Sequence, residues 1–322
     1  MAQPFPAIDD SSARTTERLS AFQTEWLTKK PNDQFFEKYP TIDYFMKTCK
    51  VVKEGGAQLG GHIGHGESPN RRDADDYDEY STSGTDAVDV VVYPWKLQFD
   101  SYSISYKEMR ELAGKDHALF NRVGEGMDRI RSTHVKRMNE DLYAAATVAK
   151  KITRLPLAID SAGAIGGLSA ATVSAWSSTE NDAVNLAGMY EVMKETRDEL
   201  WNHKASPARI FTTFAVRRYL ESLFDPDVRY ASGAEMSRGV GNDPNALMFS
   251  GLPIQADADC TAGIQYWVDP SMFQFVVDSD CDMKFGEARK GEKQWAYNTP
   301  FINCCQLVLL GRREQGKIIN CA

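Results

Sequence analysis

The chain has 322 residues, 42% of them apolar and 25% charged, with a formal net charge of −8. These values are typical of a soluble globular protein with two domains or one elaborated domain. A net acidic chain is not expected to grip nucleic acid through a basic face, although it could enclose nucleic acid without binding it tightly. The apolar run Leu307–Leu310 is far shorter than the roughly 20 residues of a membrane span, and residues 1–14 lack a signal peptide's apolar segment.

Residues 1–48 are expected to form an N-terminal arm with no apolar partner nearby in the chain. Helices are predicted over residues 15–29 and 33–47, each with aromatic side chains on one face, and Pro40 must bend or break the second. Such a face needs another element or a neighbouring subunit to cover it. The candidate contact residues of the arm are Trp26, Phe35 and Phe36.

Residues 49–104 are expected to form a long hairpin whose end is polar and rich in glycine. The second arm, residues 88–104, alternates so that Leu97 and Phe99 share a face with Val91, and its proline predicts an edge strand. A loop this long within a compact domain usually has a function. Isolated surface ion pairs are worth only about 0–1 kcal/mol, but contacts repeated in an assembly add up. The candidate contact residues at the tip are Arg71, Arg72, Asp73, Asp75, Asp76, Asp78 and Glu79.

A long helix is the element around which the fold is expected to be organised. Ser105 and Glu108 form a capping-box pattern before a short helix, and a second helix is predicted from Asp116 to about Lys151. Roughly 35 residues at 1.5 Å each give about 50 Å of helix. Because it has a single apolar stripe, it needs a sheet or another subunit along it. The stripe contains Phe120, Val123, Met127, Ile130, Met138, Leu142 and Ala145, with His134 in a gap.

The remainder of the chain is predicted to be α+β, with most of its strands toward the C-terminus. Residues 157–178, rich in Ala, Gly and Ser, are predicted to be a flexible connection that begins a second domain. A helix capped by Thr179–Asp182 is predicted to follow. A long strand is predicted from Trp295 to Leu310, followed by a last hairpin that turns at residues 311–316.

No residue pattern indicates catalysis, a cofactor or a metal. His62 and His65 lie in a glycine run without a third ligand at recognisable spacing. The glycines are followed by acids, which disfavour phosphate, and Asp278, Asp280 and Asp282 lack the glycine and glutamate of a calcium loop. The cysteines show no CxxC spacing and are expected to be buried or half-buried thiols in a reducing compartment. They are Cys49, Cys260, Cys281, Cys304, Cys305 and Cys321.

The order of these parts resembles that of a tailed-phage major capsid protein with the HK97-like fold. Residues 96–109 look like that family's passage from a hairpin strand into its spine helix. Leu252–Ile254, Tyr266–Pro270 and the ending Gln306–Gly316 are similar to its C-terminal pattern. The similarity extends over residues 33–322, and its specific signal is the order of the motifs.

The resemblance implies an α+β fold with an N-terminal arm, an extended β-hairpin loop, a long spine helix and an axial domain. The implied divisions are residues 1–48 for the arm, 49–104 for the extended loop, 105–156 for a peripheral domain with the spine helix, 157–290 for the axial domain, and 291–322 for a C-terminal return to the peripheral domain sheet.

The resemblance also implies a structural protein rather than an enzyme. Copies of the chain would form hexamers and pentamers that close into an icosahedral head around double-stranded DNA, in the virion, after assembly in the host cytoplasm. The implied partners are the chain itself, a portal and possible decoration proteins. Because the sequence starts directly with the arm, a separate scaffolding protein is implied, or a scaffolding segment removed earlier.

Two alternatives remain open at this point. One is an encapsulin-like compartment, in which the same fold encloses cargo protein. The other is a soluble α+β enzyme that uses the loop containing His62 and His65.

Overall fold

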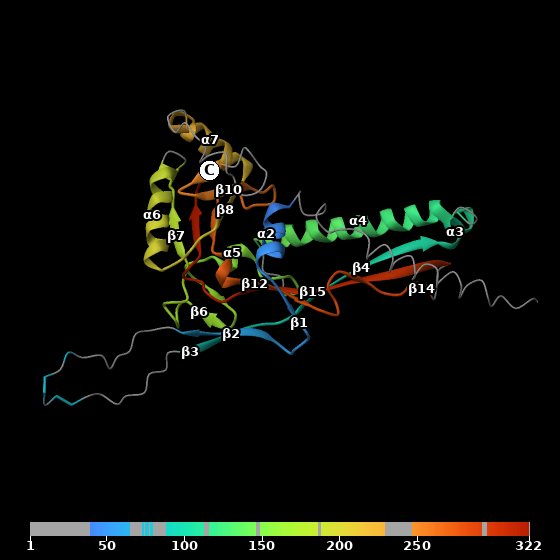
Figure 1. Cartoon of the computed structure of the whole chain (residues 1–322), viewed down its shortest axis with the longest axis horizontal. Coiled ribbons are helices and arrows are strands. Elements are labelled where there is room, and N and C mark those ends of the chain that lie inside the picture. The colour runs from blue at the N-terminus through green and yellow to red at the C-terminus, as the bar shows by residue number, and fades with distance from the viewer. Residues whose placement is uncertain are drawn as a thin grey trace, which may run out of the picture.

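The protein, obtained as a computed structural model, is elongated, with a thick body at one end and a narrow extension at the other (Figure 1). The structure describes residues 39–64, 73, 75–76, 78–79, 88–112, 116–145, 149–185, 188–228, 247–291 and 295–321. The helix predicted over residues 15–29 lies outside the described residues. The arm is seen only in α2 (Pro40–Thr48), which begins at the proline instead of bending there, because proline fits the first turn of a helix.

A long sheet runs from the body into the extension (Figure 1). Its central strand is β15 (Ala296–Leu309), which was predicted and is confirmed within a residue at each end. Antiparallel β4 pairs with its first ten residues, from Ala296 opposite Ser105 to Cys305 opposite Lys96. The strands of this long sheet are β1 (Lys50–Lys53), β12 (Phe273–Asp278), β15, β13 (Lys284–Phe285), β14 (Arg289–Lys290) and β4 (Lys96–Ser105).

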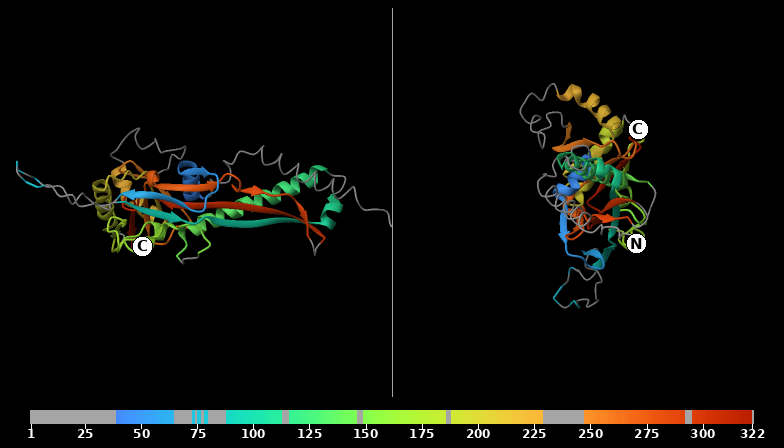
Figure 2. Two further views of the ribbon diagram at one scale, coloured as in Figure 1. Left: turned by 90° about the horizontal axis from the view of Figure 1, so that it is seen from below. Right: turned by 90° about the vertical axis from the view of Figure 1, so that its right-hand side faces the viewer.

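Helix α4 (Asp116–Tyr143) lies along the β4–β15 pair, as Figures 1 and 2 both show. It follows α3 (Tyr106–Leu112), whose start is capped by a 3.1 Å hydrogen bond from Glu108 N to Ser105 Oγ. This is the half of the predicted capping box that the serine supplies. The predicted apolar stripe is confirmed from Val123 to Leu142, because Val123, Met127, Ile130, Met138 and Leu142 are all buried. Its last predicted member, Ala145, is exposed beyond the helix end, and the side chain of Phe120 lies outside the described residues.

Helix α4 ends at Tyr143, so the prediction that it extends to about Lys151 is wrong. Its 28 residues span about 42 Å. The chain turns back because Ile152 and Leu155 enter the core. Just beyond the helix, Arg154 Nη1 donates to Ala144 O at 2.8 Å.

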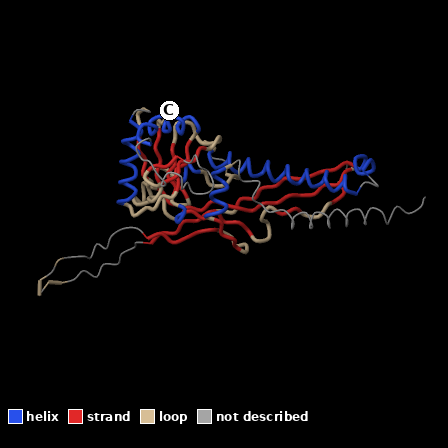
Figure 3. The backbone as a smooth tube through the Cα atoms, turned by 45° about the horizontal axis from the view of Figure 1, so that its top comes forward, coloured by secondary structure: helices blue, strands red, loops and turns tan. Residues whose placement is uncertain are grey.

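A second sheet, the body sheet, forms with its helices the thick end of the molecule. Figure 3 shows its strands flanked by helices. Residues Thr179–Asp182, predicted to cap a helix, form an edge strand, and the helix starts later, at Met189. The body sheet has the order β7 (Thr179–Asp182), β16 (Gly316–Ile319), β11 (Gln265–Val268), β8 (Arg209–Thr212), β10 (Leu252–Ala256) and β9 (Leu247–Phe249), with helices α6 (Met189–Asn202) and α7 (Phe214–Val228).

The last strand differs from the expectation that residues 291–322 return to one sheet. β15 lies in the long sheet, whereas β16 pairs with β11 and β7 of the body sheet. The turn between them is held by Gln315, which accepts from Asp269 N at 2.9 Å and donates to Asp269 O at 3.2 Å. The chain therefore crosses between sheets here and does not form the predicted hairpin.

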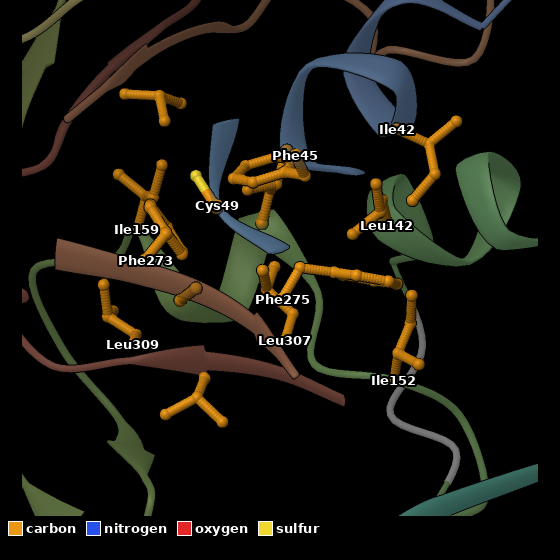
Figure 4. Close-up of a cluster of buried hydrophobic side chains, with 14 of the residues drawn as sticks. Ile42, Phe45, Cys49, Leu142, Ile152, Ile159, Phe273, Phe275, Leu307 and Leu309 are labelled. Carbon is orange, nitrogen blue, oxygen red and sulfur yellow. The ribbon is translucent and has the colours of Figure 1, made fainter. Parts of the chain in front are cut away.

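An apolar core joins the two sheets. Phe45 of α2 packs edge-on against Phe273 of β12 at 5.3 Å (Figure 4). It also stacks on Phe211 of β8 at 6.5 Å. Beside this core, the buried carboxylate of Asp257 accepts hydrogen bonds from Thr41 Oγ1 at 2.6 Å and from Asn139 Nδ2 at 2.9 Å. The arm's last helix, α4 and the body sheet are thus tied together at one point.

Residues 157–178, predicted to be a flexible connection, are ordered around one arginine. The guanidinium of Arg312, which is 0% exposed, donates to five backbone carbonyls, those of Leu157, Ala158, Ala162, Gly163 and Trp176, at 2.6 to 3.3 Å. Small residues let this segment fold tightly around the side chain. The segment contains α5 (Leu155–Ala158), β5 (Ala164–Ile165) and β6 (Leu168–Ser169).

Candidate assembly surfaces

The base of the predicted hairpin is a two-stranded antiparallel sheet of β2 (Leu59–Gly64) and β3 (Val88–Tyr93), which lies beside the body (Figure 1). The glycine run expected to be an extended loop therefore forms a strand over part of its length. A Cβ at Gly60 would clash with the carbonyl oxygen of Val91, and one at Gly61 with the side chain of Leu310. These glycines permit close packing of the hairpin base.

One face of the hairpin base packs against the body, and its other face is exposed to solvent. Tyr93 donates from its hydroxyl to Leu309 O at 3.0 Å, and burial raises its pKa. On the other face, Val88 and Val90 are exposed although they are apolar and β-branched. A bare apolar strand face in a monomer is a candidate contact surface.

The described acids of the hairpin tip are all exposed: Asp73, Asp75, Asp76, Asp78 and Glu79. A turn brings two of them together, because Asp78 N donates to Asp75 O and Asp75 N donates to Asp78 Oδ2, each at 3.0 Å. The other predicted contact residues lie outside the described residues: Arg71, Arg72, Trp26, Phe35 and Phe36. The contact role of the tip and the arm stays a prediction.

The long sheet has an exposed apolar face in the extension. Phe99 is 65% exposed and Leu97 is 49% exposed, whereas Val91 is fully buried. The predicted single face therefore does not exist, because Pro94 separates β3 from β4. In β4 the inward positions belong to residues such as Tyr102, which packs so closely on α4 that a Cβ at Gly126 would clash with its ring.

The far end of the extension carries an exposed aromatic cluster that sequence reasoning missed. Trp295 is 71% exposed, and its ring meets that of Tyr106 edge-on at 5.5 Å. Lys290 lies over the Trp295 ring at 4.8 Å, and Arg110 over the Tyr106 ring at 5.7 Å. Tryptophan, tyrosine and arginine are the residues enriched where protein interfaces gain most of their energy. The signal available in the sequence was an aromatic residue at a strand end among cations.

The described side chains bear on the metal and membrane alternatives. Within the described ranges, no three His, Cys, Asp or Glu side chains are grouped as metal ligands, and no helix has the length and apolarity to cross a membrane. The free thiols of Cys260 and Cys305 are buried, and that burial raises their pKa, which keeps them protonated and unreactive. Burial also lowers the pKa of His134 to about 4, where it lies 2.9 Å from Asn303 Nδ2.

The structure resembles several solved capsid structures. The chain aligns with a protein of the cyanophage A-1(L) capsid asymmetric unit at TM-score 0.59 and 16% identity, covering 88% of this chain and 92% of the other. It aligns with the capsid protein of an empty GTA particle at TM-score 0.58 and 11% identity, covering 86% and 96%. No protein-family model matches the chain, and no curated protein matches it in sequence.

An encapsulin is also similar. The holo-SrpI encapsulin complex from Synechococcus elongatus PCC 7942 aligns at TM-score 0.55 and 10% identity, covering 98% of this chain and 96% of the other. The chain thus has the fold of tailed-phage capsid proteins, which the order of its sequence motifs indicated as HK97-like. It is a mixed α+β structure with several sheets.

Proposed function

We propose that this chain is the major capsid protein of a tailed bacteriophage, which assembles into hexamers and pentamers that form an icosahedral head around double-stranded DNA. The observation that carries this proposal is a capsid fold whose extension leaves large apolar side chains bare, Phe99 and Trp295 foremost. Bare faces of this size are stable in water when further copies cover them.

In this proposal each part of the chain has a role in the shell. Residues 1–48 form an arm and residues 49–104 an extended loop, both of which contact neighbouring copies through the candidate residues of the arm and the tip. Residues 105–156 carry the spine helix of a peripheral domain, and residues 157–290 form the axial domain apart from β12, β13 and β14, which belong to the long sheet. Residues 291–322 connect the two, because β15 and β16 lie in different sheets.

The acidity of the chain suits a container for DNA. With a net charge of −8, the subunit gains little from counterion release on phosphates and encloses DNA without binding it tightly. The same proposal includes a scaffolding protein, a portal, possible decoration proteins, and assembly in the host cytoplasm. None of these roles requires catalysis.

A second candidate is an encapsulin-like compartment that encloses cargo protein. The similarity to the SrpI encapsulin over nearly the whole of both chains supports it. Electron microscopy of particles from the native source separates the two candidates. A large shell with one portal vertex and DNA supports the first, and a small DNA-free shell the second.

The test of shell assembly uses the purified full chain and a hairpin deletion. Negative-stain microscopy of the wild type, with scaffolding protein supplied if needed, is expected to show closed shells. Removing residues 64–83 should leave a folded subunit, with unchanged circular dichroism, that no longer forms regular shells, because the tip contacts are gone. Regular shells from this deletion would refute the role of the hairpin.

A paired substitution separates assembly from the enzyme alternative. Replacing His62 and His65 by alanine should leave shell formation intact, because the proposed contacts between subunits do not use an imidazole side chain. Loss of a catalytic activity in this variant, with shells absent in the wild type, would favour an enzyme instead.

A further inference from the structure

A polar hollow of about 640 Å³ lies where three parts of the chain meet: strand β2 of the hairpin base, the end of α6, and the turn between β15 and β16. No proposed role in the shell involves it, and the hairpin deletion would remove one of its lining residues, Gly64. Its chargeable lining is mostly basic. It contains His62, His203, Lys204, Arg312 and Arg313, against the single acid Glu314 among the described lining residues.

The charge balance of this hollow favours an anion. Arg312 gives all its hydrogen bonds in the described chain to neutral carbonyls. The carboxylates whose charges reach it, Asp160 and Glu180, form ion pairs with Lys317 at 3.2 and 3.1 Å. Burial raises the pKa of Glu314, the single described acid in the lining. The electrostatic potential of the hollow is therefore positive, although the chain as a whole has a net charge of −8.

Arg313 and His203 form a prepared pair of donors. Arg313 Nε donates to His203 Nδ1 at 3.0 Å, so that ring nitrogen is an acceptor and Nε2 carries the proton. Burial, followed by the charge of Arg313, lowers the pKa of His203 and keeps this neutral tautomer. The two Nη groups of Arg313 have no hydrogen bond to any described residue. Two different side chains are thus left with N–H groups to offer a ligand.

Lys204 stands where a helix end normally has glycine. Lys204 N donates to Trp201 O at 2.9 Å and Ala205 N to Leu200 O at 3.0 Å, the two bonds of a Schellman cap, and Lys204 has φ +58°. A side chain in this left-handed conformation is strained, and glycine would relieve the strain. Its ammonium makes no ion pair with a described residue. The lysine therefore contributes charge to the hollow at a cost to the helix end.

We propose that this hollow binds a small multivalent oxyanion of the phosphate class, with phosphate or pyrophosphate free in solution as the occupant. Arg313 is suited to bidentate contact with two oxygens, and Lys204 supplies a point charge. His62 closes the site from the hairpin side. A bound anion would link β2 to α6 and so hold the hairpin base against the body.

The experiment titrates pyrophosphate into the full-length protein by isothermal calorimetry at constant ionic strength. Arg313→Gln and Lys204→Gly should each weaken binding about tenfold, because each removes one charge-assisted contact. Lys204→Gly should also keep or raise the melting temperature without anion, which shows that the loss is not unfolding. Lys290→Gln, which removes an equal charge at the far end of the extension, is the matched control and should bind like the wild type.

Three results would overturn the proposal. Absence of binding to the wild type is one, and unchanged affinity in both Arg313→Gln and Lys204→Gly is another. The third is an equal loss in Lys290→Gln, which would show that only net charge matters. His62→Ala, an exposed position, adds a check from the hairpin side and should weaken binding by a smaller factor.

Discussion

The body sheet and the long sheet bury their faces in different ways. Every residue of β11 in the body sheet is buried, with α6 and α7 packed against the strands beside it. The β4 strand of the long sheet has α4 on one face and leaves Leu97 and Phe99 exposed on the other. The body sheet is thus complete within one chain, whereas the extension has a face left for something else to cover.

Because of this difference, substitutions in the two regions should affect either the stability of the single subunit or its assembly with other copies. Substitutions inside the body should lower the free energy of unfolding of a single subunit. Substitutions on the bare face of the extension should leave the subunit stable and change only what it does with other copies. The comparison can be tested with three predictions, taken from the largest expected effect on the subunit to the smallest.

Arg312→Met should cost the most, about 3–5 kcal/mol of unfolding free energy, because it leaves five carbonyls in buried or partly buried hydrogen bonds without their donor. Urea unfolding followed by tryptophan fluorescence measures the loss. Arg313→Met next to it is exposed and should change the unfolding free energy by less than about 0.5 kcal/mol. Equal stability of the two variants would show that the body does not depend on this arginine.

His134 should make the extension sensitive to acid. Burial lowers its folded pKa to about 4, with smaller effects from Asp100, Arg137 and Asp141, against 6.5 in the unfolded chain. Between these values only the unfolded chain takes up the proton, so stability is complete above pH 6.5 and falls as the pH drops toward 4. The full loss is about 3 kcal/mol.

The measurement is urea unfolding at several pH values between these limits. His134→Gln, which cannot titrate but retains groups able to pair with Asn303, is the matched control and should show a flatter profile. A wild-type profile as flat as that of the variant would contradict the role of His134.

Phe99→Ser should have the smallest effect on the subunit, within about 0.5 kcal/mol, because the ring is already in water. It should nevertheless reduce the yield of closed shells, since the proposed neighbour loses its apolar contact. Phe301→Ser on β15, fully buried against α4, is the opposite case and should unfold the extension. Shell yields unaffected by Phe99→Ser would remove this face from the assembly surfaces.

Much of the fold could be read from local patterns. The 3.6-residue spacing of the α4 stripe predicted its buried face, and the strand predicted from Trp295 to Leu310 matches β15 within a residue at each end. These predictions worked because burial along one element depends on neighbours in sequence. The candidate assembly surfaces were harder to predict from the sequence than the elements of the fold. The exposure of Leu97 and Trp295 contradicts their apolar character, and only the complete sheet shows which face is bare.

The errors share a physical cause. Residues 157–178 looked flexible because they are small, yet Arg312, distant in sequence, orders them. Helix α4 was extended too far because its end is fixed by Ile152 entering a core that belongs to other elements. β16 was paired with β15 because the turn suggested a hairpin, whereas Gln315 and Asp269 direct it to the body sheet.

The sequence by itself determined the class of fold, the order of the elements and the identity of the long helix, because these follow from periodicity, caps and the order of motifs. The tertiary structure alone decided where the glycine run becomes a strand, which side of the long sheet stays bare, and how His62 comes to lie beside Lys204 and Arg313. Such decisions depend on contacts between residues far apart in the chain, which no local pattern records.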